Sequence, residues 1–218
     1  MGDSDNVIYD TSGFSNNFVS SAGYMYFNFA DDFEDLFMDE NLDYIISSDD
    51  REISGLGWFS GSPRYSGCYT FNGRDQRMYG IINIGIVFTV SCWVYINDTP
   101  NTMAYIISLN NDFGMTDQQF AISISDANFV IAAGGESIEG DTFSINQWYH
   151  LCLTCDGFIA KFYINGLLDN SFVPGEVVGT NCNIGARSNS LSNETAADYV
   201  NGNICDVRIY STCLNNNE

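Results

Sequence analysis

Short runs in which apolar and polar residues alternate dominate the pattern along this chain. They are rich in β-branched and aromatic residues and are separated by Gly, Asn and Asp, which is typical of β-strands joined by tight turns. The runs lie at 68–71, 88–96, 105–109, 120–125, 129–133, 148–155, 160–164, 182–185 and 204–210. Because long helical periodicity is almost absent, the pattern predicts an all-β protein, either a sandwich or a jelly roll.

Turn signals connect these runs into one unit. Asp156-Gly157 and Asn165-Gly166 bracket the run at 160–164, which predicts a ladder of hairpins. No Pro-rich or Ser-rich linker divides the sequence. We therefore expect residues 1–218 to form a single domain.

One acidic segment interrupts the pattern. Residues 31–52 carry ten acidic side chains against one basic side chain, and their apolar residues favour a short helix over 32–40 followed by a strand. We interpret the region at about 24–60 as an insertion. It is either a solvated segment held to the outside of the sandwich by its aromatic residues, or a loop that binds a partner or a cation. It lacks the D-x-D-x-D-G spacing of a calcium loop.

Composition and charge exclude several classes of partner. Of the 218 residues 45% are hydrophobic, as in globular proteins. The 28 acidic and 7 basic side chains give a net charge of −21, which repels phosphate backbones and anionic bilayers and argues against nucleic-acid binding. The sequence contains no apolar stretch of about 18 residues, and its start does not resemble a signal peptide. We expect no membrane insertion, and assembly in the cytoplasm.

The cysteine and histidine content argues against a zinc, redox or triad site. The seven cysteines mostly lie in the alternating runs, which is typical of buried thiols in a reducing environment. Cys152 and Cys155 lie three residues apart on one predicted strand, so their side chains point to opposite faces. His150 is the single histidine, and no His-based triad is available. We interpret His150, Trp93 and Trp148 as structural residues of the sheet.

Four segments, taken in order, resemble one known family. They read YDTSGFSNN at 9–17, YTFNGRD at 69–75 with FTVSCWV at 88–94, WYHLCLTCDG at 148–157 with FYING at 162–166, and NGNICDVRIY at 201–210. Together they are similar to laminin G-like, concanavalin A-like jelly-roll domains. The resemblance implies an all-β fold, a concanavalin A-like (laminin G-like) jelly-roll sandwich of two antiparallel sheets.

The resemblance also implies a metal site. Members of the family often hold one structural Ca²⁺ through loop carboxylates and backbone carbonyls, and the two chain ends lie close together in such a sandwich. Matched by position, the candidate ligands are Asp10 and Asp206. Two alternatives remain open: Asp10 caps a turn, and Asp206 accepts hydrogen bonds from Arg208 or from the backbone.

The resemblance suggests recognition rather than catalysis. Glycan-hydrolysing relatives carry paired carboxylates on one concave strand, whereas the alternating runs of this chain contain almost no acid except Asp206. We therefore expect the protein not to be an enzyme. The sequence does not single out ligand-binding residues.

The sequence of residues 62–73 is similar to the corresponding segment of such domains in proteins of bacteriophages and their gut hosts. We therefore expect a recognition or adhesion domain at a virion surface or tail fibre, which contacts host glycans or surface proteins and neighbouring virion proteins. It can also form a homo-oligomer. The alternatives are a purely structural capsid or appendage decoration protein without sugar binding, and an extracellular location.

Overall fold

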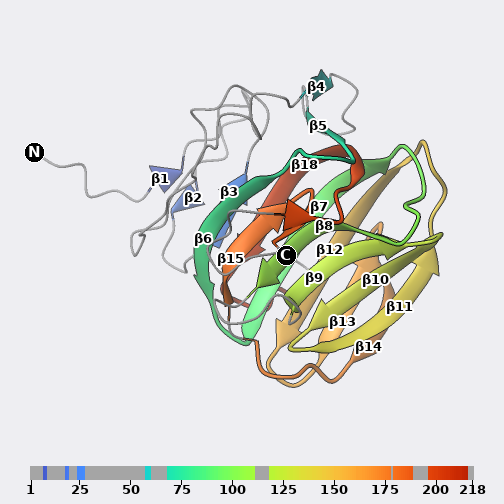
Figure 1. Cartoon of the computed structure of the whole chain (residues 1–218). Helices are drawn as coiled ribbons and strands as arrows, with labels where there is room; N and C mark the ends of the chain where they lie inside the picture. The colour runs from blue at the N-terminus through green and yellow to red at the C-terminus, as the bar shows by residue number, and fades with distance from the viewer. Residues whose placement is uncertain are drawn as a thin grey trace, which may run out of the picture.

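The computed structural model describes residues 7–8, 18–19, 24–27, 57–59, 68–110, 118–177, 179–188 and 196–215. Two antiparallel sheets stack face to face within these ranges, with the smaller sheet in front in Figure 1. The predicted all-β fold and its two-sheet jelly-roll sandwich are confirmed. The described residues contain no helix long and apolar enough to cross a membrane.

The larger sheet has eight strands, and a strand from the C-terminal part of the chain lies inside it. This strand, β18 (Asn201–Tyr210), pairs with β7 (Val87–Ile96) on one side. On its other side it pairs first with β5 (Cys68–Asn72) and then with β3 (Tyr24–Phe27). The other strands are β4 (Gly57–Phe59) beside β5 and, beyond β7, β12 (Trp148–Asp156), β13 (Ala160–Ile164) and β14 (Leu167–Phe172).

The smaller sheet has six strands in the order β11-β10-β9-β8-β15-β6. Their bounds are Met78–Ile84 (β6), Met103–Asn110 (β8), Gln118–Ser125 (β9), Asn128–Ala133 (β10), Glu136–Thr142 (β11) and Gly179–Ile184 (β15). Two short ladders lie outside both sheets. They join β1 (Val7–Ile8) to β2 (Phe18–Val19), and β16 (Arg187–Ser188) to β17 (Ala196–Ala197).

The core lies between the sheets and is built from the apolar positions of the alternating runs. In β7, every second residue from Phe88 to Ile96 is buried in this core. The ring of Phe129 in β10 lies 5.4 Å from the ring of Tyr149 in β12 and 6.1 Å from that of Phe162 in β13. Such aromatic contacts join the two sheets, and burial of each ring contributes about 1.5–3 kcal/mol.

Strands that the alternation pattern missed lie at sheet edges. β6 and β11 are the two edges of the smaller sheet, and β14 is an edge of the larger sheet. Most residues of β11 and β14 are exposed, so these strands need no apolar face. The acidic segment at 31–52, with its predicted helix over 32–40 and the strand predicted after it, lies outside the described residues. β3 and β4 fall within the range interpreted as an insertion, yet both pair within the larger sheet.

The predicted Asn165-Gly166 turn joins β13 to β14. Both residues have positive φ, 52° and 80°, as a two-residue hairpin turn requires. Asn165 also binds the turn to β12: its Oδ1 accepts a hydrogen bond from the His150 N–H at 2.9 Å, and its own N–H donates to the His150 carbonyl at 2.8 Å. These bonds extend the pairing of β12 with β13 into the turn.

Candidate functional site

A groove of about 440 Å³ lies on the outer face of the larger sheet. Strands β7, β12, β13 and β18, the β13–β14 turn and the segment after β18 all contribute to it. Its hydroxyl, phenol and imidazole groups come from Thr89, Ser91, His150, Thr154, Tyr163 and Tyr210. Leu167 and Leu168, which are 75% and 56% exposed, form an apolar lip. The volume falls in the range of roughly 300–1,000 Å³ occupied by ligand sites.

Strand alternation explains why polar groups line the groove. In β12, Leu151 and Leu153 are fully buried in the core, so His150, Cys152 and Thr154 project from the opposite face. β7 contributes two hydroxyl groups in the same way. The lining is therefore carried by paired strands rather than by long loops, which fixes its geometry.

A register shift in β18 brings two charged side chains to the groove. The pairing of β18 with β7 shifts between Cys205 and Arg208, and Asp206 within this shift has a φ of 50°. Bulges of this kind redirect side chains. Here the Nε of Arg208 donates to Oδ1 of Asp206 at 2.7 Å. The Asp206 side chain is only 3% exposed, so this is a largely desolvated ion pair.

The segment after β18 is anchored at the groove by one hydroxyl group. Oγ1 of Thr89 donates to the carbonyl of Thr212 at 2.8 Å and accepts from the Leu214 N–H at 2.9 Å. Leu214 and Asn215 then line the groove. The chain beyond β18 therefore forms part of the wall.

Aromatic pairs continue the same face beyond the groove. The ring of Trp93 lies 5.2 Å from that of His150, and the ring of Tyr95 lies 5.5 Å from that of Trp148. Trp93 and Trp148 are partly buried against the core, in agreement with the prediction that they anchor the sheet. Among the described residues no hydrogen-bond acceptor meets the buried Nε1 of Trp93.

The thiol in the groove is not poised as a nucleophile. Burial, with a smaller contribution from Cys213, raises the pKa of Cys152 to about 12, so the thiol stays protonated at neutral pH. Cys155 lies in the core on the other face of β12, as the strand prediction required. Six cysteines are free thiols, namely Cys92, Cys152, Cys155, Cys182, Cys205 and Cys213, which agrees with the prediction from the sequence.

A second hollow, of about 390 Å³, lies at one end of the sandwich. The β7–β8 loop and the beginning of β18 contribute to it, as does Tyr199. Polar groups there bind one another. Nδ2 of Asn201 donates to Oδ2 of Asp98 at 2.8 Å, and Oδ1 of Asn201 accepts a hydrogen bond from Nδ2 of Asn97 at 3.1 Å. These bonds hold the loops together.

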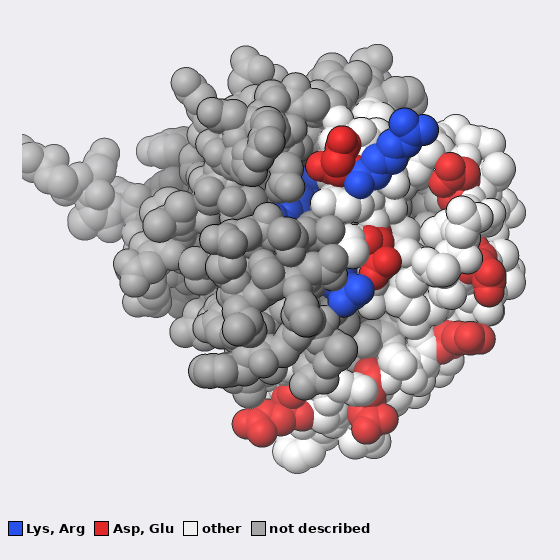
Figure 2. Space-filling model, viewed as in Figure 1, with Lys and Arg blue, Asp and Glu red and all other residues white. Residues whose placement is uncertain are grey.

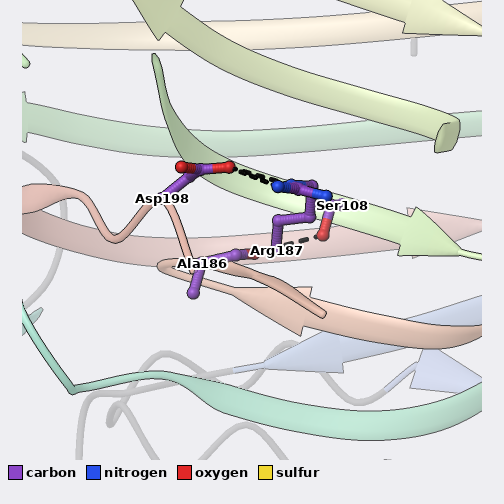
Figure 3. Close-up of polar contacts among 4 residues, drawn as sticks. All are labelled: Ser108, Ala186, Arg187 and Asp198. Atoms are coloured by element: carbon purple, nitrogen blue, oxygen red, sulfur yellow. Dashed lines mark hydrogen bonds and ion pairs between the residues drawn. The ribbon is translucent and has the colours of Figure 1, made fainter. Parts of the chain in front are cut away.

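An ion pair joins β16 to the residue that follows β17, and separate hydrogen bonds hold this segment on β8 of the smaller sheet. Nη2 of Arg187 lies 2.8 Å from Oδ2 of Asp198, and Figure 3 shows the carboxylate directed at the guanidinium. In the same view, Oγ of Ser108 donates to the carbonyl of Ala186 at 3.1 Å. The Asp198 carbonyl accepts the N–H of Tyr105 in β8 at 2.9 Å. These contacts fix the segment on β8.

The structure describes one of the two predicted calcium ligands, Asp206. Asp206 is bonded to Arg208, which is one of the alternatives the sequence left open, whereas Asp10 lies outside the described residues. No group of three or more His, Cys, Asp or Glu side chains suited to a metal ion occurs in the described ranges. A calcium ion at Asp206 would compete with the Arg208 guanidinium for the same carboxylate.

Comparison with known families identifies the fold. Residues 85–218, more than half of the chain, match the concanavalin A-like lectin/glucanases superfamily, in its laminin G group. The chain belongs to this superfamily. A stretch of 145 residues is 26% identical to the adhesion G-protein coupled receptor V1 of Danio rerio, and covers 60% of this chain but only 2% of the receptor.

Solved structures show the same fold at low identity. Domain 4 of the arabinanase AbnA from Geobacillus stearothermophilus, in complex with arabinotriose, is 18% identical with a TM-score of 0.55, covering 74% of this chain and 78% of that one. The heptameric SAP-like pentraxin of Limulus polyphemus is 16% identical with a TM-score of 0.56, covering 67% and 76%. The Trypanosoma rangeli sialidase in complex with the inhibitor DANA is 15% identical with a TM-score of 0.53, covering 71% and 27%.

These comparisons correct one prediction. The prediction that the protein is not an enzyme is wrong. The superfamily includes glucanases, and the similar structures include a sialidase and a domain of an arabinanase. At 13–18% identity these similarities establish the fold alone. They assign no catalytic activity to this chain.

The groove itself was not found from the sequence. Its residues occupy the polar positions of runs whose apolar positions revealed the strands, as in His150-x-Cys152-x-Thr154. Those polar positions were a usable signal. The place of Asp206 in the groove could not be predicted from this signal, because it depends on a register shift in β18.

Proposed function

We propose that this domain recognises a glycan, and that the glycan binds in the groove on the outer face of the larger sheet. The observation that carries the proposal is the lining: hydroxyl, phenol and imidazole groups on rigid strands lie beside the apolar lip of Leu167 and Leu168. A sugar ring presents a rim of hydroxyl groups and a face of C–H groups, and such a lining suits both. Membership of a superfamily of lectins and glucanases supports the proposal.

A pair of tyrosine variants tests where the glycan binds. Tyr163 lines the groove and Tyr199 lines the second hollow. A glycan array identifies ligands, and titration calorimetry then compares Tyr163→Ala with Tyr199→Ala. We expect Tyr163→Ala to weaken binding at least tenfold and Tyr199→Ala to leave it unchanged. The reverse result would place the site in the second hollow, and blank arrays with folded protein would refute glycan recognition.

We further propose a place for this recognition: the surface of a virion or tail fibre, where the ligand is a glycan or protein of the host surface. The resemblance of residues 62–73 to phage proteins supports this proposal. Electron microscopy of virions decorated with an antibody against the domain tests it, and absence from purified particles would refute it.

One structural calcium ion bound by Asp10 and Asp206 also stays a proposal. It rests on the family resemblance, and it requires the ion to replace Arg208 at Asp206. We expect excess EDTA to lower the melting temperature if calcium is bound. An unchanged melting temperature would refute the site.

A second candidate function is structural packing without sugar binding. Exposed apolar residues gather at one end of the larger sheet, where β7 begins opposite the end of β12. They are Ile86, Val87, Phe158, Ile159 and Val173. Such a patch suits contact with a neighbouring protein. Sedimentation of the purified domain distinguishes self-association from a monomer.

A further inference from the structure

We infer that the groove selects electrically neutral glycans and rejects carboxylated ones, and that the Asp206–Arg208 pair sets this selectivity. The inference rests on the proposed function and adds the chemical class of the ligand. It follows from the charge of the groove lining and from the charge of the whole protein.

Among the residues that the structure describes, the groove lining carries one carboxylate and one guanidinium, and they are bonded to each other. Arg208 Nε donates to Asp206 Oδ1 at 2.7 Å, and the two side chains are 21% and 3% exposed. At this distance the two formal charges cancel for any ligand more than a few ångströms away. The other described lining groups are hydroxyls, a thiol, an amide, apolar side chains and one imidazole, so the one guanidinium among them is already bonded to a carboxylate.

The surrounding field disfavours anions. The chain has 28 acidic and 7 basic side chains, a net charge of −21. On the face that Figure 2 shows, which is the side of the smaller sheet, acidic side chains predominate over basic ones among the described residues. A carboxylated glycan therefore approaches against a negative potential, and the paired Arg208 does not offset that potential. A neutral glycan meets no such barrier.

The bulge in β18 explains how the pair is built. In a regular strand, residues 206 and 208 would lie on the same side as the buried Ile204, but the shift between Cys205 and Arg208 and the positive φ of Asp206 bring both to the groove. The result is a buried carboxylate held against its own near neighbour. Removal of the carboxylate charge would take away the acid that is bonded to the guanidinium, while Arg208 keeps its place in the groove lining.

The test compares the wild type with Asp206→Asn, in EDTA so that no calcium competes for Asp206. The probes are neutral oligosaccharides and glucuronate- or sialate-containing ones of the same length, measured at 20 and 500 mM NaCl. We expect wild type to bind neutral glycans at least tenfold more tightly than acidic ones, with little salt dependence. Asp206→Asn should gain binding of acidic glycans, and salt should reverse this gain.

The double variant Asp206→Asn/Arg208→Gln is the matched control, because it has no charge at either position and should not gain acidic binding. If the wild type binds no glycan at all, the proposed function fails. If it binds acidic glycans as tightly as neutral ones, the proposed function stands and this inference is overturned. The wild-type comparison decides the question even if the variants do not fold.

Discussion

The carboxylate of Asp169 in β14 accepts the backbone N–H of Asp141 in β11, with both oxygens within reach at 3.2 and 3.3 Å. β14 and β11 are edge strands of different sheets, so this contact closes one side of the sandwich. Nδ2 of Asn170 adds a second link, to the Glu139 carbonyl at 3.2 Å. Side chains thus satisfy edge backbone groups that would otherwise be open to another strand.

The negative charge of Asp169 destabilises its contact with Asp141, and a substitution can remove that charge. Burial, and then the nearby charge of Asp141, raise the pKa of Asp169. Asp169→Asn keeps an oxygen for the Asp141 N–H and removes the charge. We expect the variant to be more stable than wild type at pH 7 by a few tenths of a kcal/mol, as for partly exposed charges, measured by urea unfolding.

The pH dependence of the same pair has a definite sign. Because the pKa of Asp169 is raised in the folded state, protonation of this side chain stabilises the fold. This contribution to the free energy of unfolding is complete below the unfolded pKa of about 3.9 and is lost as the pH rises through the folded pKa. The stability difference between Asp169→Asn and wild type should therefore shrink on acidification. A variant less stable than wild type at pH 7 would contradict this account.

Gly185 is a position where any side chain should destabilise the fold. Its φ is 86°, and an added Cβ would collide with the ring of Phe71, which is fully buried. Gly135 has a similar φ of 83° with nothing near its Cβ position. We expect Gly135→Ala to cost about 1–2 kcal/mol and Gly185→Ala roughly 1–3 kcal/mol more, by chemical denaturation. Equal costs would show that Phe71 can move aside.

The Arg187–Asp198 pair should control local opening at β8. Its side chains are 22% and 28% exposed, so Arg187→Gln should cost about 1–2 kcal/mol, less than the roughly 3–5 kcal/mol of fully buried pairs. Hydrogen exchange of the Tyr105 N–H, which donates to Asp198, should speed up. The double variant Arg187→Gln/Asp198→Asn should restore part of the protection. Unchanged exchange in the single variant would contradict this role.

The thiols should differ in reactivity. Burial raises the pKa of Cys182 to about 12 and also raises that of Cys92, whereas Cys213 is only partly buried. In native protein at pH 8 we expect iodoacetamide to modify Cys213 first and to leave Cys182 and Cys92 intact, as read by peptide mass spectrometry. Protein unfolded in urea is the control, in which all should react. Rapid labelling of native Cys182 would contradict the buried assignment.

The sequence predicts those parts of the fold in which burial alternates along a strand. The runs at 88–96 and 148–155 fall within β7 and β12, and the Asn165-Gly166 turn lies where expected. Edge strands such as β11 escaped prediction, because a strand that is exposed and paired on one side does not require alternation.

The groove was harder to predict because it is a property of neighbouring strands. Thr89 and Thr154 are 65 residues apart in sequence, yet they lie opposite each other in the ladder of β7 and β12. The ion pair of Asp206 and Arg208 depends on a shift in register that no local pattern marks. Only the paired sheet brings these groups together.

The position of β18 has a consequence for how the chain folds during synthesis. Residues 201–210 separate β7 from β5, β4 and β3, so these earlier strands have no common sheet until β18 leaves the ribosome. Contacts this distant in sequence form slowly and leave hydrophobic strands exposed in the meantime. A nascent chain stalled before residue 201 should therefore bind chaperones, and release of the last strand should complete the sandwich.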